Sequence, residues 1–71
     1  MEALMTDEEG AASLVLETRR AMGMTAIEFG ARMRKDKATI WRWEHGRSTP
    51  SFGECEYMRG LLAKARASRR K

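Results

Sequence analysis

The chain has 71 residues, of which 42% are apolar and 34% charged, and its formal net charge is +4. A chain of this length forms one small domain, which buries only about 60% of its unfolded surface. It has no apolar run close to the roughly 20 residues that cross a bilayer, and no basic and then apolar leader. Its single cysteine, Cys55, excludes an internal disulfide. We therefore expect a cytoplasmic globular protein without a membrane segment.

The first ten residues are acidic, and we expect the first helix to begin among them. Thr6 is placed to cap a helix, with Glu9 at the third helical position. We predict an acidic N-terminal segment over residues 1–10 that is partly helical or frayed. The helix should continue to about Met22, because Gly23 stands where a left-handed C-cap ends a helix. Its apolar residues recur at threes and fours: Leu14, Val15, Thr18, Ala21 and Met22.

A capping box that starts at Thr25 predicts a second helix over residues 26–33. Phe29 and Met33 are four residues apart and would face the core. Gly30 lies inside this short helix, where glycine costs about 1 kcal/mol relative to alanine. We therefore expect another stretch of backbone to pass close to it.

Residues 34–36 are predicted to form a turn, in which Asp36 caps a third helix over residues 37–45. Ile40 and Trp43 would point to the core. At 100° per residue, the opposite arc of roughly 140° carries polar and aromatic residues: Lys37, Ala38, Trp41, Arg42 and His45. Gly46 is expected to stop this helix.

A fourth helix is predicted over residues 52–67, after a loop that ends at Pro50 and Ser51. Its expected core stripe is Phe52, Cys55, Met58, Leu62 and Ala65. Residues 68–71 form a predicted basic tail. No repeat and no alternating strand pattern occurs. The predicted fold is all-α, with residues 11–67 in a compact domain of four or five helices.

Two short helices joined by three residues, the second with a polar outward side, have the layout of a helix-turn-helix. Such a unit places its second helix in the major groove of DNA. Six cations also gather within sixteen residues: Arg32, Arg34, Lys35, Lys37, Arg42 and Arg47. A cluster of this kind is typical of nucleic-acid binders. From charge alone, an ordinary solvated surface remains the alternative.

Four segments carry a family resemblance: residues 23–25, 27–30, 38–47 and 50–51, which read GMT, IEFG, ATIWRWEHGR and PS. The most specific part is I-x-x-W-E-x-G-R-x-x-P, from Ile40 to Pro50. Over residues 19–62 the chain thus resembles the Xre/Cro/cI-type helix-turn-helix family of phage repressors, bacterial regulators and antitoxins. The resemblance implies a lambda-repressor-like domain that binds double-stranded DNA sequence-specifically, as a small bacterial or phage transcriptional repressor.

The resemblance also implies roles for individual positions. Base edges would be faced by Lys37, Ala38, Trp41 and Arg42. Phosphate contacts are expected at the start of the second helix, in the turn, on the third helix and in the following loop: Thr25, Ala26, Arg34, Lys35, Thr39, Arg47, Ser48 and Thr49. Arg19 and Glu44 match a charged pair that ties the first helix to the end of the third. Losing one member of a buried pair costs about 3–5 kcal/mol.

The chemistry of the outward residues supports different degrees of specificity. Arg42 is the first candidate for base reading, because a guanidinium pairs bidentately with guanine O6 and N7. A phosphate or solvent contact is its alternative, and Lys37 is open to a base or a phosphate. Ala38 offers only a methyl group, which suits thymine or a close approach. Trp41 would pack on thymine methyls or sugars, or else fold back onto the second helix near Arg34.

Partners other than DNA are also predicted. Tyr57 and Leu61 lie beside the core stripe and are candidates for a two-fold homodimer contact, with ordinary surface exposure as the alternative. The runner-up function is an antitoxin or another protein-interaction module, which binds a toxin or other regulator as well as DNA. His45 and Cys55 do not fill the four positions of a structural zinc site. Because no nucleophile and base stand together, we expect neither an enzyme nor a cofactor.

Overall fold

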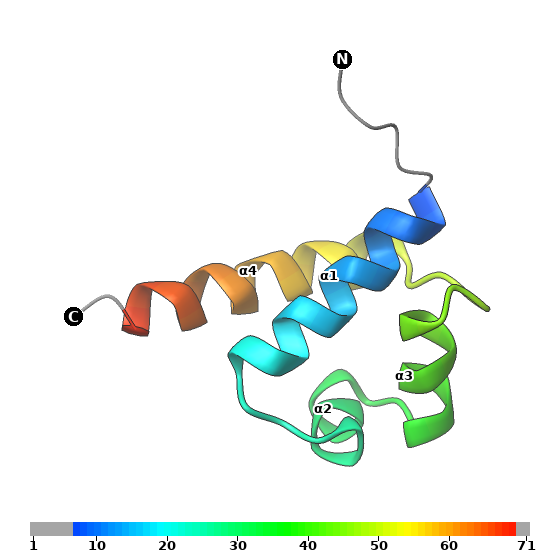
Figure 1. Cartoon of the computed structure of the whole chain (residues 1–71), viewed down its shortest axis with the longest axis horizontal. Helices are drawn as coiled ribbons and strands as arrows, with labels where there is room; N and C mark the ends of the chain where they lie inside the picture. The colour runs from blue at the N-terminus through cyan, green and yellow to red at the C-terminus, as the bar shows by residue number, and fades with distance from the viewer. Residues whose placement is uncertain (1–6, 70–71) are drawn as a thin grey trace.

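The computed structural model describes residues 7–69, which form four α-helices and no β-strand (Figure 1). The helices are α1 (Asp7–Ala21), α2 (Ala26–Met33), α3 (Lys37–Glu44) and α4 (Phe52–Arg69). The all-α prediction is therefore confirmed for this part of the chain, with four helices. None of these helices is long and apolar enough to span a membrane.

The helix boundaries agree with the sequence prediction to within two residues. α2 has the predicted bounds, whereas α1 and α3 each end one residue early. α4 continues two residues beyond the predicted end, so residues 68 and 69 are helical and do not belong to a separate tail. Residues 7–10 of the acidic segment are the first turn of α1. The predictions for residues 1–6, including the Thr6 cap, and for residues 70–71 lie outside the described residues.

Short-range hydrogen bonds and glycines set the helix ends. The Thr25 hydroxyl accepts from the Glu28 amide at 3.1 Å, and the Glu28 carboxylate accepts from the Thr25 amide at 2.9 Å. This is the predicted capping box, and it satisfies two donors that the first turn of α2 leaves without a partner. Gly23 and Gly46 follow α1 and α3 with φ of 66° and 71°. Both have the left-handed conformation that ends a helix, as predicted.

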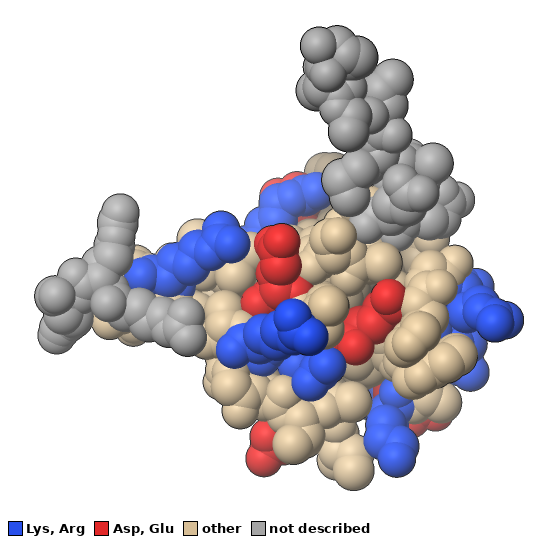
Figure 2. Space-filling model, in the orientation of Figure 1, with Lys and Arg blue, Asp and Glu red and all other residues tan. Residues whose placement is uncertain are grey.

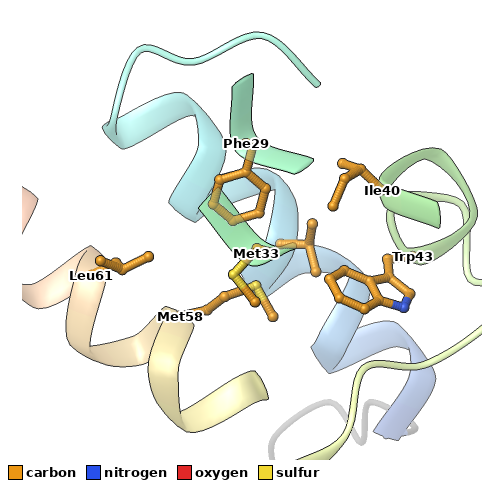
Figure 3. Close-up of a cluster of buried hydrophobic side chains, with 7 residues drawn as sticks. Phe29, Met33, Ile40, Trp43, Met58 and Leu61 are labelled. Atoms are coloured by element: carbon orange, nitrogen blue, oxygen red, sulfur yellow. The ribbon is translucent and has the colours of Figure 1, made fainter. Parts of the chain in front are cut away.

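α1 and α4 lie side by side and run in the same overall direction, while α2 and α3 lie together on one side of α1 (Figure 1). α3 contacts both α1 and α2. All four helices contribute to one core cluster (Figure 3). Its buried residues are Val15, Phe29, Met33, Ile40, Trp43, Met58 and Leu61. The core therefore fixes the position of α3 by holding its inward side, Ile40 and Trp43.

Two predictions for α4 are wrong. Phe52 is 79% exposed, and Leu61 is buried in the core with 9% exposure. On a helix with 100° per residue, Leu61 lies roughly 60° from the fully buried Met58, whereas Phe52 lies roughly 120° from it. Phe52 is also the first residue of α4, where the helix has only just begun to pack. The buried stripe is therefore rotated towards Leu61.

A hydroxyl group is buried on the inward side of α1. Thr18 is fully buried, and its hydroxyl donates to the Leu14 carbonyl at 2.6 Å. This bond satisfies the polar group inside the helix itself, so Thr18 fills a core position without leaving an unpaired donor.

The turn between α2 and α3 passes against Gly30. A Cβ atom at this position would lie 2.6 Å from the Lys35 carbonyl oxygen. The predicted close approach of backbone to Gly30 is thus confirmed, and the approaching backbone is the turn itself. The turn begins at Arg34, which has a left-handed φ of 62°. An L side chain in that conformation costs about 1–2 kcal/mol, so the tight turn is formed at some cost in stability.

Candidate nucleic-acid interface

The outward side of α3 lines an open groove of about 610 Å³. The four residues predicted to face base edges, Lys37, Ala38, Trp41 and Arg42, all line it. The remaining lining residues come from α1, from the start of α2, and from the end of α3 and the loop after it: Arg19, Ala26, Glu44 and Arg47. The structure therefore brings these four predicted positions together on one concave surface.

Basic side chains surround this groove. Lys37, Arg42 and Arg47 are exposed, and all three line it. Figure 2 shows lysine and arginine side chains along the edge of the molecule where α3 and the following loop lie. Cations placed together around a groove raise the local concentration of anionic ligands.

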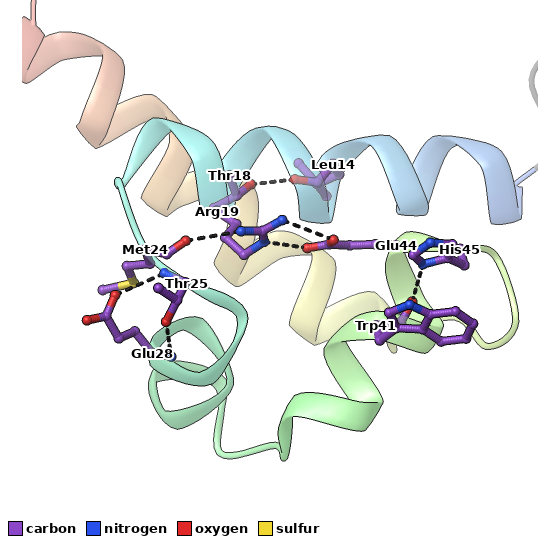
Figure 4. Close-up of polar contacts among 9 residues, drawn as sticks. All are labelled: Leu14, Thr18, Arg19, Met24, Thr25, Glu28, Trp41, Glu44 and His45. Atoms are coloured by element: carbon purple, nitrogen blue, oxygen red, sulfur yellow. Dashed lines mark hydrogen bonds and ion pairs between the residues drawn. The ribbon is translucent and has the colours of Figure 1, made fainter.

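An ion pair at the inner side of the groove joins α1 to the end of α3 (Figure 4). Arg19 Nε donates to Glu44 Oε2 at 2.6 Å, and Arg19 Nη2 donates to Glu44 Oε1 at 3.2 Å. A third donor, Arg19 Nη1, bonds the Met24 carbonyl at 3.2 Å. The hydrogen bond to Glu44 raises the pKa of Arg19, which favours the charged guanidinium. The predicted pair is confirmed, and its bidentate geometry fixes the direction of α3 relative to α1.

A chain of hydrogen bonds runs along the exposed side of α3. The Thr39 hydroxyl donates to Asp36 Oδ1 at 2.6 Å, and Arg42 Nη2 donates to the Thr39 hydroxyl at 3.3 Å. Asp36 Oδ1 also caps α3 by accepting from the Thr39 amide at 2.9 Å. The hydrogen bond from the Thr39 side chain lowers the pKa of Asp36. Because its hydrogen is donated to Asp36, the Thr39 hydroxyl cannot also donate to a phosphate in this arrangement, and it orients Arg42 instead.

Trp41 does not fold back onto α2. Its ring stacks on His45, with ring centroids 4.1 Å apart and an interplanar angle of 18° (Figure 4). His45 Nδ1 lies 2.9 Å from the Trp41 carbonyl oxygen, and the Arg47 guanidinium lies 5.9 Å from the centre of the Trp41 ring. The alternative in which Trp41 covers α2 near Arg34 is therefore wrong, and Trp41 remains 48% exposed.

The sequence reasoning did not predict that His45 stacks on Trp41, although the spacing of the two residues indicates such a contact. Trp41 and His45 are four residues apart, the spacing at which side chains on a helix meet. The sequence prediction places His45 on the outward side of the third helix and gives it no partner there. In the part of the chain that the structure describes, no three His, Cys, Asp or Glu side chains gather as a metal site would require. The sequence predicts Asp36 as a cap, and the structure adds the hydrogen bonds that connect it through Thr39 to Arg42.

The predicted phosphate-contacting residues lie at the start of α2, in the turn before α3, on α3 and in the loop after it. At the start of α2, the Thr25 hydroxyl accepts a capping hydrogen bond, which leaves its own hydrogen available. In the turn, Arg34 is exposed, but the Lys35 ammonium is paired with Glu54 Oε2 of α4 at 3.1 Å. Beyond α3, the exposed residues are Arg47, Ser48 and Thr49. Of the predicted phosphate-contacting residues, Lys35 and Thr39 are already engaged by carboxylates, those of Glu54 and Asp36.

No family model, no curated protein and no solved structure matches this chain. The functional interpretation therefore depends on the geometry of the chain's own residues.

A second exposed region lies between α2, α4 and Met22, the residue that follows α1. Tyr57 is 47% exposed, and its hydroxyl accepts from Arg32 Nε at 3.3 Å. A shallow groove of about 230 Å³ lies in the same region, where Leu61 forms part of the lining. The other lining residues are Met22, Arg32, Lys64, Ala65 and Ser68. Of the predicted dimer pair, Tyr57 is therefore available to a partner, whereas Leu61 contributes mainly to the core.

Proposed function

We propose that this protein binds double-stranded DNA sequence-specifically through a lambda-repressor-like helix-turn-helix formed by α2 and α3, of the Xre/Cro/cI type. The observation that carries the proposal is the groove lined together by Lys37, Ala38, Trp41 and Arg42. A helix enters the major groove, which is about 12 Å wide, with its outward side chains towards the base edges. The cations that surround this side of α3 fit the phosphates on either side of such a groove.

The residues divide into base-reading and phosphate-binding groups. Arg42 would pair with guanine O6 and N7, and its orientation is held by Thr39. Arg47 would bind phosphate, together with Arg34 and the backbone and hydroxyl groups of the loop after α3. Phosphate contacts fix the protein on the duplex, while base contacts select the sequence. Binding should weaken steeply with salt, since each neutralised phosphate releases counterions.

In a cell, this activity corresponds to a small transcriptional regulator, a repressor of bacterial or phage type, located in the cytoplasm at the nucleoid. The proposed role is binding rather than catalysis, without a cofactor. We further propose a homodimer in which Tyr57 contributes to the contact. A two-fold dimer would bind two half-sites about 34 Å apart, one turn of the double helix.

The proposal is tested by selecting bound duplexes from a random pool at near-physiological salt and sequencing them. A palindrome supports a dimeric regulator, and its half-site spacing reports the dimer geometry. A short single site keeps the DNA-binding function but removes the dimer. No enrichment contradicts sequence-specific binding.

Three arginine variants separate the proposed roles. Arg42→Ala should weaken binding to the selected site by about 1–3 kcal/mol and abolish the preference at one guanine. Arg47→Ala should weaken binding to all sequences alike and reduce the salt slope by about 1. Arg59→Ala is the control, because Arg59 lies on α4, is paired with Glu56 and does not line the groove. If all three variants behave alike, the assigned interface is wrong.

The second candidate function is binding of a partner protein, such as a toxin or another regulator. The exposed Tyr57 beside the shallow groove at Leu61 favours it, because an amphipathic ring next to apolar surface is common in protein interfaces. Co-purification of a partner that is lost on Tyr57→Ala, with DNA binding unchanged, would support it. A monomer that captures no partner would contradict both the dimer and this second function.

A further inference from the structure

The groove along α3 has an unusual chemical character for a surface proposed to read base edges. Three of its lining residues, Ala26, Ala38 and Trp41, present only apolar groups towards it, apart from the indole N–H. Ala26 is the first residue of α2, while Ala38 and Trp41 are three apart on α3. The small side chains at 26 and 38 allow close approach, and the large ring of Trp41 forms a wall.

The Trp41 wall is held in place before any ligand binds. Its ring stacks on His45, whose own ring is held by the 2.9 Å contact to the Trp41 carbonyl oxygen. Arg47 lies 5.9 Å from the same ring. These contacts fix the ring while leaving it about half exposed. Exposed apolar surface marks a binding site where it is contiguous, and Trp41 lines the same groove as Ala26 and Ala38.

The major groove presents a single methyl group on its floor, the C5 methyl of thymine. Adenine and guanine present hydrogen-bond donors and acceptors there, and cytosine presents a donor beside a C5 atom that carries only hydrogen. Covering such polar groups with alanine and tryptophan would remove their water without replacing its hydrogen bonds, which is unfavourable. The apolar surface formed by Ala26, Ala38 and Trp41 therefore fits a C5-methylated pyrimidine and disfavours the other bases.

A base-specific donor stands directly beside this wall. Arg42 follows Trp41 in the chain, and its guanidinium is oriented by the Thr39 hydroxyl. An arginine in this position suits guanine. A methyl-accepting surface and a guanine-reading side chain thus lie in one groove.

From this arrangement we infer that the groove formed by Ala26, Ala38 and Trp41 receives the C5 methyl of one thymine, next to the guanine bound by Arg42. The inference rests on the proposed function and specifies its ligand: a C5-methylated pyrimidine adjacent to guanine. 5-Methylcytosine carries the same methyl group at the same place in the groove, so it shares this chemistry.

The test uses the unmodified protein and the duplex obtained by selection. Each thymine is replaced in turn by deoxyuridine, which removes the methyl group and keeps the base pair. At one thymine beside a selected guanine, binding should weaken about fourfold, the effect of one buried methyl group. The other thymines should change binding less than twofold. Replacing the sensitive base pair by cytosine–guanine, with and without a 5-methyl group, should show a gain from the methyl group alone.

Two variants then assign the effect to the groove. In Trp41→Ala, the affinity ratio between thymine and uracil at the sensitive position should fall to about one. Phe52→Ala is the matched control, because it also removes an exposed aromatic ring, one that does not line the groove, and its ratio should stay at about fourfold. Specific binding with no sensitive thymine, or a ratio unchanged in Trp41→Ala, overturns the methyl inference alone. Absence of any sequence-specific binding overturns the proposed function, and the inference with it.

Discussion

Replacing Glu44 by glutamine should destabilise the fold more than its single lost charge would suggest. The side chains of Arg19 and Glu44 are only 23% and 11% exposed, and two hydrogen bonds join them. Glu44→Gln keeps the shape and one acceptor, but it leaves the Arg19 guanidinium partly buried without its counter-charge. Hydrogen bonds to charged groups contribute about 1.5–3 kcal/mol, and breaking a buried pair costs about 3–5 kcal/mol.

Because part of Arg19 remains in water, we expect a loss below the range for a fully buried pair, about 2–3 kcal/mol. For a domain of 60–100 residues each kcal/mol lowers the melting temperature by about 4–8 °C, so the melting temperature should fall by about 8–24 °C. The assay is thermal and urea unfolding followed by helical circular dichroism. The double variant Arg19→Met/Glu44→Gln should lose less free energy of unfolding than the sum of the two single variants, because Arg19→Met removes the buried charge that Glu44→Gln leaves without a partner.

The chain supplies a matched control in the Arg59–Glu56 pair. It has the same 2.6 Å separation, but its side chains are 57% and 53% exposed. Glu56→Gln should therefore change the free energy of unfolding by less than about 0.5 kcal/mol. Equal losses in Glu44→Gln and Glu56→Gln, or strict additivity in the Arg19 and Glu44 cycle, would refute the reasoning that burial makes the first pair strong.

Three further predictions concern the turn and the cap. Gly30→Ala should lower the free energy of unfolding in urea by about 1–3 kcal/mol, because the new Cβ would lie 2.6 Å from the backbone of the turn. Gly60→Ala is the control: a Cβ at Gly60 meets open space, so this change should stabilise α4 by up to about 1 kcal/mol. Arg34→Gly should stabilise the fold by about 0.5–1 kcal/mol by relieving the left-handed φ of 62°, and a loss of stability would contradict this account of the turn. The hydrogen bond from the Thr39 side chain holds the pKa of Asp36 below its ordinary value of 3.8. The ionised Asp36 carboxylate therefore contributes its full stabilisation of the fold at pH values above 3.8, and this contribution is lost as the pH falls through the lowered pKa of the folded state. In Asp36→Asn, the free energy of unfolding should fall less steeply as the pH is lowered from about 5 to 2. An unchanged dependence on pH would contradict the assignment.

Sequence reasoning predicted the features that depend on neighbouring residues. The bounds of α2 follow from the capping box at Thr25, and the ends of α1 and α3 follow from Gly23 and Gly46. Each of these signals acts over three or four residues of backbone. They are therefore readable without knowing how the helices pack.

Features that depend on the rotation of a helix against its neighbours were less predictable. In α4 the expected stripe included Phe52 and omitted Leu61, although it correctly included the buried residues Met58 and Leu62. When the buried side of a helix contains only four or five residues, rotating the helix by about 60° about its axis keeps most of the same residues buried. Only packing against α1 and α2 decides between the two rotations.

Side-chain conformations in the groove were the least predictable part. The positions of Trp41 and Arg42 on the outward side of α3 follow from helical spacing. Their partners do not: the sequence left open whether Trp41 would cover α2, and it assigned Thr39 to phosphate. The structure stacks Trp41 on His45 and places Thr39 between Asp36 and Arg42. Such choices depend on rotamers, each of which is decided by a few hydrogen bonds and contacts.

The ties at the two ends of α3 connect stability with the proposed function. With eight residues, α3 is about 12 Å long, and a helix of that length does not persist alone in water. Glu44 fixes its last turn to α1, and Asp36 caps its first turn, next to a Lys35 that is tied to α4 through Glu54. The outward side chains are therefore presented by a helix that is already ordered, so binding need not supply the free energy of ordering it. Loosening either end should then reduce affinity for the selected duplex even where no groove-facing side chain has changed.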